Sequence, residues 1–231
     1  MTITETTTVG EIAAALPASI RVFQRREIDF CCGGKKPLAN ACAEQGLSFN
    51  EVVDEIASST IAPPEVGTDW SRAPLDALTA HIVRTYHEPL RAELPRLNAM
   101  AAKVAKVHGG RDARLGSIAS TLAMLSDELQ THMRKEELML FPIIEAVETG
   151  APASMGLDAP ISVMKHEHDH AGALLAELRS STDAYSPPQW GCATVRALYS
   201  GLAELEDTMH LHVHLENNVL FPRALRLLQD A

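Results

Sequence analysis

Two segments of the sequence carry the same residue types at the same offsets. In each, a histidine is followed four residues later by a glutamate, and a Phe-Pro pair closes the segment. Residues four apart on a helix lie one above the other on one face, so each segment offers an imidazole nitrogen and a carboxylate in one direction. That pair is half of a metal site. The two segments are His132–Pro142 and His212–Pro222.

The repeat extends toward the N-terminus of each segment. His87 lies 45 residues before His132, and His168 lies 44 residues before His212. Each copy therefore predicts a helical hairpin, with one His on its first helix and a His-Glu pair on its second. Two hairpins form a four-helix bundle, an architecture that holds two iron or manganese ions between Glu and His side chains of facing helices.

The two His-Glu pairs fall on the apolar faces of their helices. Each of the four residues follows a leucine or a methionine by seven residues. An ionisable group on a core face is costly unless it is paired or ligated. A duplicated structural hairpin would keep Phe and Pro but need not keep the polar pair, so metal binding is the better interpretation. Nitrogen and carboxylate ligands without cysteine suit iron, manganese or zinc.

The other histidines of the expected bundle lack this repeat. Two pairs of histidines lie two residues before and after the candidate ligands His168 and His212. They therefore point in other directions, and we expect them on the surface or as neighbours of the ligands. A fifth, six residues before His87, is interpreted as a rim residue, and His108 is expected to be solvated at a helix end. The individual roles of the five stay open: they are His81, His166, His170, His210 and His214.

A second chemical feature lies near the N-terminus. Cys31 and Cys32 are adjacent and are followed by two glycines, which disfavour a helix interior and predict a loop, here called the thiol loop (Asp29–Lys35). With two lysines nearby and a helix N-terminus following, we expect a lowered thiol pKa, and hence thiol chemistry or metal binding. The alternative is one small buried residue and one incidental thiol. That alternative is our expectation for the isolated Cys42 and Cys192.

Turn and cap signals predict the helices that position these residues. Residues 1–60 form a small helical domain, with helices at about 9–16, 17–26, 37–42 and 48–58. A linker is predicted at 61–69, because the segment Ser58–Asp69 is rich in Pro, Ser and Thr and has no helical period. Residues 70–231 form the bundle, with helices at about 74–107, 112–147 and 160–183 and a last one starting at Pro187-Pro188. Pro89 and Pro95 should interrupt the first of these, with a kink one turn from His87.

Composition narrows the class of protein. A net charge of −10 over 231 residues and a pI near 5.4 argue against a nucleic-acid partner. No run of 18 apolar residues occurs, so we expect no membrane span. The N-terminus lacks a basic region before an apolar stretch, which favours a cytoplasmic protein without a signal peptide. In that compartment the four cysteines are expected as thiols or metal ligands rather than as disulfides.

Longer motifs around these residues resemble a known family. Residues 70–228 resemble a hemerythrin-like cation-binding domain, and the thiol loop resembles the signature of the short domain ahead of it in the bacterial repair-of-iron-centres proteins. Members often show a second His shortly after Tyr-His, where this chain has Pro89-Leu90-Arg91. The motifs are Thr85-Tyr86-His87, His132-Met-x-Lys-Glu136-Glu, Pro160-Ile-Ser-Val-Met164, Glu167-His168-Asp169 and Leu215-Glu216-Asn-Asn-x-Leu-Phe-Pro222-Arg-Ala-Leu.

The resemblance implies an all-α fold, a hemerythrin-like four-helix bundle preceded by a small helical domain. It also implies an oxo-bridged centre of two iron ions, bridged by Glu136 and Glu216, and makes Cys31 and Cys32 the functional thiols. The implied iron ligands are His87, His132, Glu136, His168, His212 and Glu216, the same six that the repeat indicates.

These observations lead to one leading hypothesis and two alternatives. The leading hypothesis is a cytoplasmic stress-response protein that supplies iron to proteins whose iron–sulfur clusters were damaged by nitric oxide or oxidants. The first alternative is an enzyme that reduces nitric oxide at the di-iron centre. The second is a reversible carrier or sensor of dioxygen or nitric oxide, a role that needs no thiol loop. The client proteins, the electron donor and a homodimer joined through the thiol loop stay open.

Overall fold

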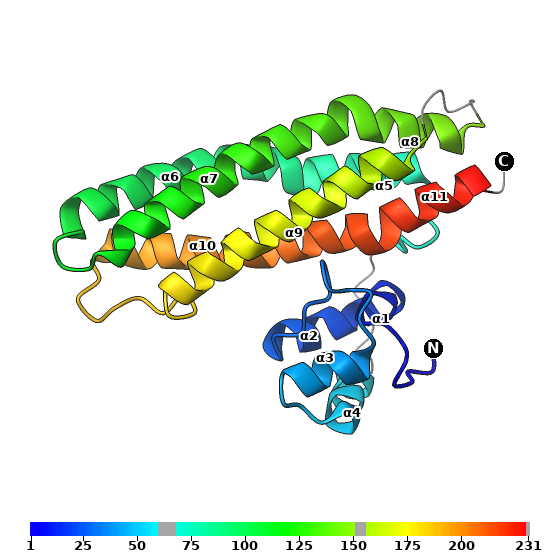
Figure 1. The fold of residues 1–231 in the computed structure, drawn as a ribbon, viewed down its shortest axis with the longest axis horizontal. Helices are drawn as coiled ribbons and strands as arrows, with labels where there is room; N and C mark the ends of the chain where they lie inside the picture. The colour runs from blue at the N-terminus through cyan, green and yellow to red at the C-terminus, as the bar shows by residue number, and fades with distance from the viewer. Residues whose placement is uncertain (60–67, 151–155, 230–231) are drawn as a thin grey trace.

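The computed structural model describes residues 1–59, 68–150 and 156–229, and over these ranges the chain is helical with no strand. Four long helical columns lie side by side as a bundle, and a smaller helical unit packs against it (Figure 1). The predicted all-α fold is thereby confirmed. None of the described helices is long and apolar enough to cross a membrane.

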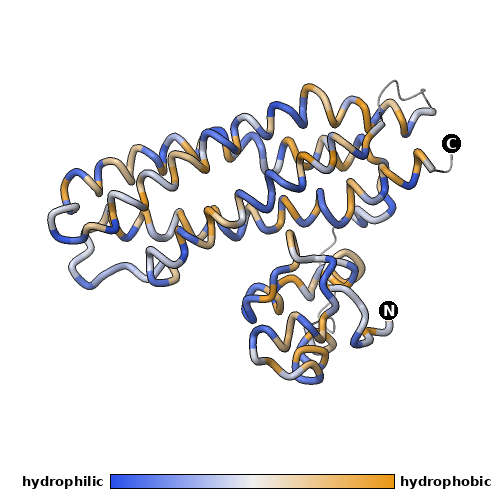
Figure 2. Tube along the Cα trace, viewed as in Figure 1, coloured by the Kyte–Doolittle hydropathy of each residue, from blue (hydrophilic) through white to orange (hydrophobic). Residues whose placement is uncertain are grey.

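The N-terminal unit has an apolar core of its own, to which Phe23, Phe30 and Ile56 belong. Apolar and polar residues alternate along its short helices, as the colours of Figure 2 show. Its first helix begins with a capping box, in which the hydroxyl of Thr8 accepts from the backbone of Glu11 and the Glu11 carboxylate accepts from that of Thr8. The elements are α1 (Val9–Ala15), a 3₁₀ turn (Pro17–Ser19), α2 (Ile20–Arg25), α3 (Leu38–Glu44) and α4 (Phe49–Ser59).

The bundle has four columns, and two apolar clusters fill its interior. In every column the clusters lie on either side of the predicted ligand positions, so a band of buried polar residues occurs where they meet. The columns are α5 (Leu75–Ile82) with α6 (Glu88–His108), α7 (Arg114–Lys135) with α8 (Phe141–Glu148), α9 (Asp158–Ser181), and α10 (Ala193–His214) with α11 (Phe221–Gln229).

Three columns contain a π-helical turn at the polar band: η2 (Val83–His87), η3 (Glu136–Leu140) and η4 (Leu215–Leu220). Each π turn is followed by a helix with proline at its second position, namely Pro89, Pro142 and Pro222. Proline in an α-helix lacks an N–H and clashes with the carbonyl four residues earlier. The extra residue of a π turn relieves that conflict, and such turns are frequent at functional sites. The kink predicted at Pro89 is therefore a π turn.

Two predicted helix features are wrong. Pro95 lies inside an unbroken α6, where its exposed position lets water satisfy the Arg91 carbonyl that Pro95 leaves without a donor. The last column does not start at Pro187-Pro188, because the chain still turns there: the N–H of Gly191 donates to the carbonyl of Pro188 at 2.8 Å. It starts at Ala193, after Cys192 as the N-cap residue.

The predicted linker, 61–69, lies mostly outside the described residues, and the domain limits 1–60 and 70–231 stay a prediction.

Candidate metal centre

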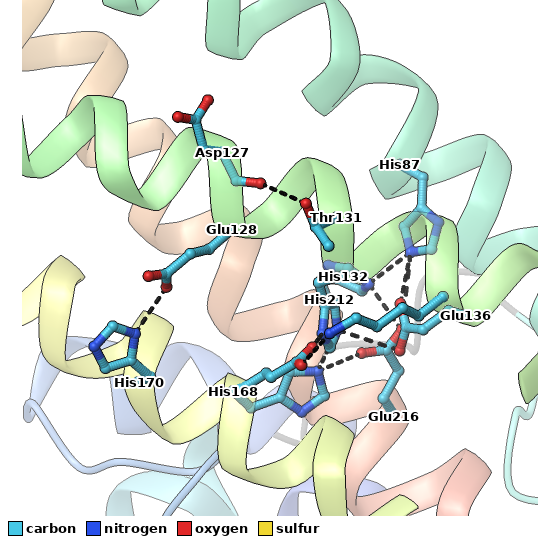
Figure 3. A network of polar contacts seen from close by, with 12 residues as sticks. His87, Asp127, Glu128, Thr131, His132, Glu136, His168, His170, His212 and Glu216 are labelled. Atoms are coloured by element: carbon cyan, nitrogen blue, oxygen red, sulfur yellow. Dashed lines mark hydrogen bonds and ion pairs between the residues drawn. The ribbon is translucent and has the colours of Figure 1, made fainter. Parts of the chain in front are cut away.

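All six residues predicted as metal ligands are buried and meet in the polar band of the bundle (Figure 3). They form two overlapping groups of four, and within each group the ligand atoms lie within 4.8 Å of one another. Glu136 and Glu216 belong to both groups. The first group adds His87 and His212, and the second adds His132 and His168.

The imidazole Nε2 atoms converge on the two shared carboxylates. In the first group, the Nε2 atoms of His87 and His212 are 3.0 Å apart, and that of His212 is 2.9 Å from Oε1 of Glu216. In the second, the Nε2 atoms of His132 and His168 are also 3.0 Å apart. Oε2 of Glu216 lies 3.1 Å from His168, so its carboxylate faces both groups.

The residues fit a bound metal pair. Both glutamates are fully buried, and the groups nearest to the oxygens of Glu136 and to Oε2 of Glu216 are the candidate histidines, with no other hydrogen-bond donor on them. A buried carboxylate left in this way is costly without a cation. Four imidazoles and two carboxylates suit iron, manganese or zinc, and the sharing of both carboxylates suits two ions.

The Nδ1 atoms of three of the four histidines have partners that point Nε2 inward. Nδ1 of His87 lies 2.7 Å from Glu137, which also pairs with Arg91. Nδ1 of His132 lies 2.8 Å from Glu167, a partner of Lys135. Partners of this kind fix the tautomer and orientation of a metal-binding imidazole.

The remaining two histidines differ from these. Nδ1 of His168 lies 3.0 Å from the amide oxygen of Asn217. Nδ1 of His212 is buried without a partner, and the ring of Tyr86 stacks on the His212 ring with their centroids 5.3 Å apart. The two ligand groups are therefore supported unequally.

The carboxylates dominate the electrostatics of the metal-free site. Burial opposes charge on His132, but Glu136, Glu216 and Glu167 outweigh it and raise the pKa of the imidazole to about 10. Burial alone would raise the pKa of Glu216, yet the surrounding histidines hold it well below its usual value. Metal binding must then displace protons from the imidazoles.

A cavity of about 550 Å³ between α7 and α9 reaches the second ligand group. His132 and His168 lie along it, with Glu128, Glu167, His166 and His170 around them. His170 pairs with Glu128 at 2.7 Å and contacts no candidate ligand, consistent with the expectation that the flanking histidines project elsewhere (Figure 3).

The thiol loop packs on the bundle beside the second ligand group. Sγ of Cys32 lies 3.6 Å from the backbone oxygen of His168, and Cys31 is 5% exposed. Asp29 shapes the loop, because its carboxylate accepts from the backbone N–H groups of Cys31 and Gly33. The structure thus brings both predicted thiols next to a predicted ligand.

The expected low thiol pKa is wrong for Cys31. The hydrogen bond with Cys32, burial and the Asp29 carboxylate raise the pKa of Cys31 well above its usual value. The two lysines do not compensate, since Lys36 pairs with Glu44 at 2.5 Å and Lys35 is exposed. All four cysteines are free thiols, as expected.

Two of the five open histidines contact the N-terminal unit or its loop. His214 is buried, with Nδ1 3.4 Å from the oxygen of Phe30, and His210 lies against the Phe30 ring. His81 stacks on Trp70, with ring centroids 4.3 Å apart, and meets the edge of Tyr86.

Sequence reasoning missed Glu137, Glu167 and Asn217 as partners of the ligand histidines. Each is adjacent in sequence to a candidate ligand, which is a signal, but neighbouring residues on a helix point in different directions. Which neighbour turns toward a histidine of another column depends on how the columns face each other.

The chain matches two family models. Residues 78–224 match the hemerythrin HHE cation binding domain, and residues 5–60 match a domain of unknown function, DUF542. The chain is similar to the iron–sulfur cluster repair protein YtfE of Edwardsiella ictaluri, with 46% identity over 94% of this chain and 96% of that protein. It is 41% identical to the proteins of the same name from Musicola paradisiaca and Cronobacter sakazakii, over 94% of this chain and 96% and 95% of theirs.

Proposed function

The chain belongs to the hemerythrin HHE cation-binding family, and from that premise we propose that it is an iron–sulfur cluster repair protein with a di-iron centre in its bundle. The two family models that it matches cover the bundle and the N-terminal unit. The similar relatives are named iron–sulfur cluster repair proteins, and the match covers nearly their full length. The comparisons do not favour nitric oxide reduction or reversible dioxygen binding.

One observation carries the proposal: a thiol pair lies against the backbone of a candidate iron ligand. Cys32 contacts His168 directly, across a sequence separation of 136 residues. A carrier of dioxygen or nitric oxide has no use for this contact. A protein that passes iron between the bundle and a client cluster does, because thiolates are ligands of both iron and iron–sulfur clusters.

The six residues take distinct roles in holding the metal. Nε2 of His87, His132, His168 and His212 would hold the metal. For the first three, the Nδ1 partner keeps the proton on the far side of the ring. Glu136 and Glu216 would each offer a carboxylate oxygen to both positions, since each belongs to both groups. When bound there, iron would supply redox chemistry and the ability to bind a small ligand such as nitric oxide or dioxygen.

The thiols act at the boundary between the bundle and a client. Cys31 and Cys32 bind iron or contact the damaged cluster once the loop leaves the buried position, because the docked loop keeps Cys31 protonated and covered. The partners are proteins with damaged iron–sulfur clusters, and the free thiols suit a reducing cytoplasm. In the docked arrangement the loop faces its own bundle, which disfavours a homodimer joined through Cys31.

Metal analysis and a repair assay together test the proposal. The chain purified without oxygen should hold about two iron ions, and His132→Ala or His212→Ala should lose them. His166→Ala is the matched control, because His166 is exposed and lies outside the ligand groups. A chain that holds zinc or no metal, with unchanged behaviour of the ligand variants, contradicts the di-iron centre.

The thiol part of the proposal has its own test. A variant with both Cys31→Ser and Cys32→Ser should retain bundle iron, because neither thiol belongs to the ligand groups. It should fail to restore activity to an enzyme whose iron–sulfur cluster has been damaged by nitric oxide. Cys42→Ser is the control, since Cys42 is buried in the core of the N-terminal unit. Normal repair by the double variant contradicts the role of the loop.

A further inference from the structure

Two adjacent asparagines lie between the metal centre and the thiol loop. They directly follow Glu216 in η4. The amide oxygen of Asn217 lies 3.0 Å from Nδ1 of His168, and its nitrogen donates to the backbone oxygen of Cys31 at 3.5 Å. One side chain therefore contacts both a candidate ligand and the thiol loop.

The second asparagine fits a cradle in the N-terminal unit. Nδ2 of Asn218 donates to the backbone oxygens of Phe30 at 3.0 Å and Cys31 at 3.3 Å. Its Oδ1 reaches so close to two glycines that a Cβ at Gly10 would lie 2.4 Å from it, and one at Gly34 would lie 2.5 Å from it. The space occupied by Asn218 explains why the loop carries glycine at position 34.

The contacts of Asn217 also determine which ring nitrogen of His168 carries the proton. The Cys31 backbone oxygen accepts only, so it faces the NH₂ group of Asn217 and leaves the amide oxygen toward His168. Nδ1 of His168 then carries the proton and donates it. Nε2, which lies 3.1 Å from Glu216, is then the nitrogen that would bind the metal.

We propose that Asn217 and Asn218 are positioning residues that couple the docking of the thiol loop to the hold on metal at His168. The proposal rests on the proposed function. Asn218 docks the loop, and the docked Cys31 carbonyl keeps the amide of Asn217 in the orientation that supports His168. When the loop leaves, Asn217 is free to turn its amide over, and His168 loses its acceptor.

Docking is measured on the metal-free chain through alkylation of Cys31, which the bundle helps to cover. Asn218→Ala removes two hydrogen bonds, and Gly34→Ala places a methyl group against Asn218. Each variant should raise the rate of iodoacetamide alkylation of Cys31, followed by peptide mass spectrometry, by about tenfold. Gly116→Ala is the control, because a Cβ there meets open space. Unchanged alkylation in both variants overturns the docking role.

Coupling is measured on the iron-loaded chain, as the rate at which a ferrous chelator removes iron. Asn217→Ala removes the acceptor of His168 and should speed release by about 10- to 100-fold, the usual effect of losing such a partner. Asn218→Ala should speed release less. Asn217→Asp presents an oxygen to His168 whichever way it turns, so it should hold iron like the parent while Cys31 becomes easier to alkylate.

The double variant isolates the coupling. If docking acts through the orientation of Asn217, Asn218→Ala should speed iron release in the parent but leave it unchanged in the Asn217→Asp background. An equal acceleration in both backgrounds overturns the proposal, as does release from Asn217→Ala at the parent rate. Circular dichroism melting of each variant shows whether it is folded. If Asn217→Ala unfolds, the comparison of Asn217→Asp with and without Asn218→Ala still tests the coupling.

The proposed function and this inference fail in different ways. A parent chain that binds no iron contradicts the di-iron centre, and the alkylation experiment still tests docking on the metal-free protein. A parent chain that binds iron and repairs clusters, with iron release independent of Asn217, leaves the function standing and overturns the coupling.

Discussion

At the scale of single residues, the Nδ1 partners distinguish the four histidines of the metal centre. His87 and His132 each face a carboxylate, and each carboxylate is in turn held by a cation. A carboxylate partner makes an imidazole a stronger ligand, whereas a neutral amide or no partner does less. Each ligand group therefore contains one strongly supported histidine and one weaker one.

This inequality makes Glu137 a test of the first ligand group. Glu137→Ala should lower the affinity of the chain for iron by about 10- to 100-fold, because His87 loses the acceptor that fixes its ring. The measurement is competition for ferrous iron against a chelator of known affinity. Glu88→Ala is the control, since Glu88 is exposed one residue after His87. Equal affinities of the two variants contradict the supporting role.

Cys192 is a second prediction at this scale, because its thiol has neighbours in the structure that its isolated place in the sequence does not indicate. The thiol is exposed at the N-cap of α10, with Nε2 of His108 at 3.5 Å. The backbone N–H of Val195 and then His108 lower the pKa of Cys192 to about 7. The thiolate fraction therefore rises with pH through about 7, and Cys192 should alkylate at roughly half its plateau rate there.

The pH profile of alkylation by residue checks this expectation. His108→Gln should move the midpoint of the Cys192 profile toward the ordinary cysteine value near 8.5, though not all the way, because the backbone N–H groups remain. Cys42 serves as the internal control, since it is 1% exposed and burial raises its pKa. A Cys192 midpoint near 8.5 in the parent chain would falsify the assignment.

At the scale of elements, the π turns set where the ligands point. The extra residue of a π turn rotates the helix segment before the turn relative to the segment after it. The relative directions of ligands on the two segments therefore depend on the π turn. Pro142→Ala and Pro222→Ala restore the missing N–H and let the helix close as an ordinary α-helix. Each should lower iron content and iron affinity while leaving helix content unchanged, as measured by metal analysis and circular dichroism.

Pro95→Ala is the matched control for these variants. Pro95 is also inside a bundle helix, but it lies two turns after the π turn η2 and eight residues after the ligand His87. It should therefore keep iron like the parent and gain stability, because alanine is the better helix former by up to about 3 kcal/mol. Loss of iron in Pro95→Ala to the same extent would mean that proline replacement disturbs the bundle generally, and the π turns would lose their assigned role.

The six candidate ligands were predictable because a repeat fixes them. Spacings of four within each pair, and of 44 or 45 between pairs and single histidines, need no knowledge of packing. The π turns were not predictable in the same way. Pro89 indicates that the regular helix is interrupted, because proline lacks an N–H and clashes with the carbonyl four residues earlier. A kink and a π turn both relieve this clash, and the packing of the polar band decides between them.

The supporting residues depend on pairs that are far apart in sequence. Asn217 meets Cys31 across 186 residues, and the pKa of Cys31 depends on the burial that this docking brings. A lysine pair near a cysteine is visible in the sequence, whereas burial against another unit is not. Local rules therefore predicted candidate ligands that the fold brings together, but they did not predict the raised pKa of Cys31.

At the scale of the whole molecule, polar and apolar contacts together hold the N-terminal unit on the bundle, and Cys31 and Ala14 pack against the apolar clusters of the bundle. Gln24 donates to Asp207 at 3.3 Å, Glu27 pairs with Arg179, and Asn218 holds the loop. Leu211 adds an apolar contact with the core of the N-terminal unit. The polar contacts can be exchanged for contacts with water at little cost, which suits a thiol loop that must leave its docked position to meet a client.

The two ion pairs of Arg179 allow docking and stability to be tested separately. One partner is an exposed residue of the N-terminal unit, and the other is a buried residue of the bundle. Its partner Glu27 is 61% exposed, whereas its partner Glu206, 2.8 Å away, is 8% exposed within the bundle. Glu27→Ala should change the free energy of unfolding by less than about 1 kcal/mol, because exposed pairs contribute little. It should still raise Cys31 alkylation severalfold, because a docking contact is lost.

Arg179→Ala should affect both quantities, because it leaves the buried Glu206 carboxylate without its partner. The cost is at most about 3 kcal/mol, at the low end for a broken buried pair, since solvent screens a cation that is 37% exposed. Urea unfolding followed by circular dichroism measures it. Arg25→Ala is the control, because its partner Glu55 lies within the same N-terminal unit and neither docking nor the bundle depends on the pair. If Glu27→Ala destabilises the chain as much as Arg179→Ala, the two units unfold as one and the docked loop is not free to leave.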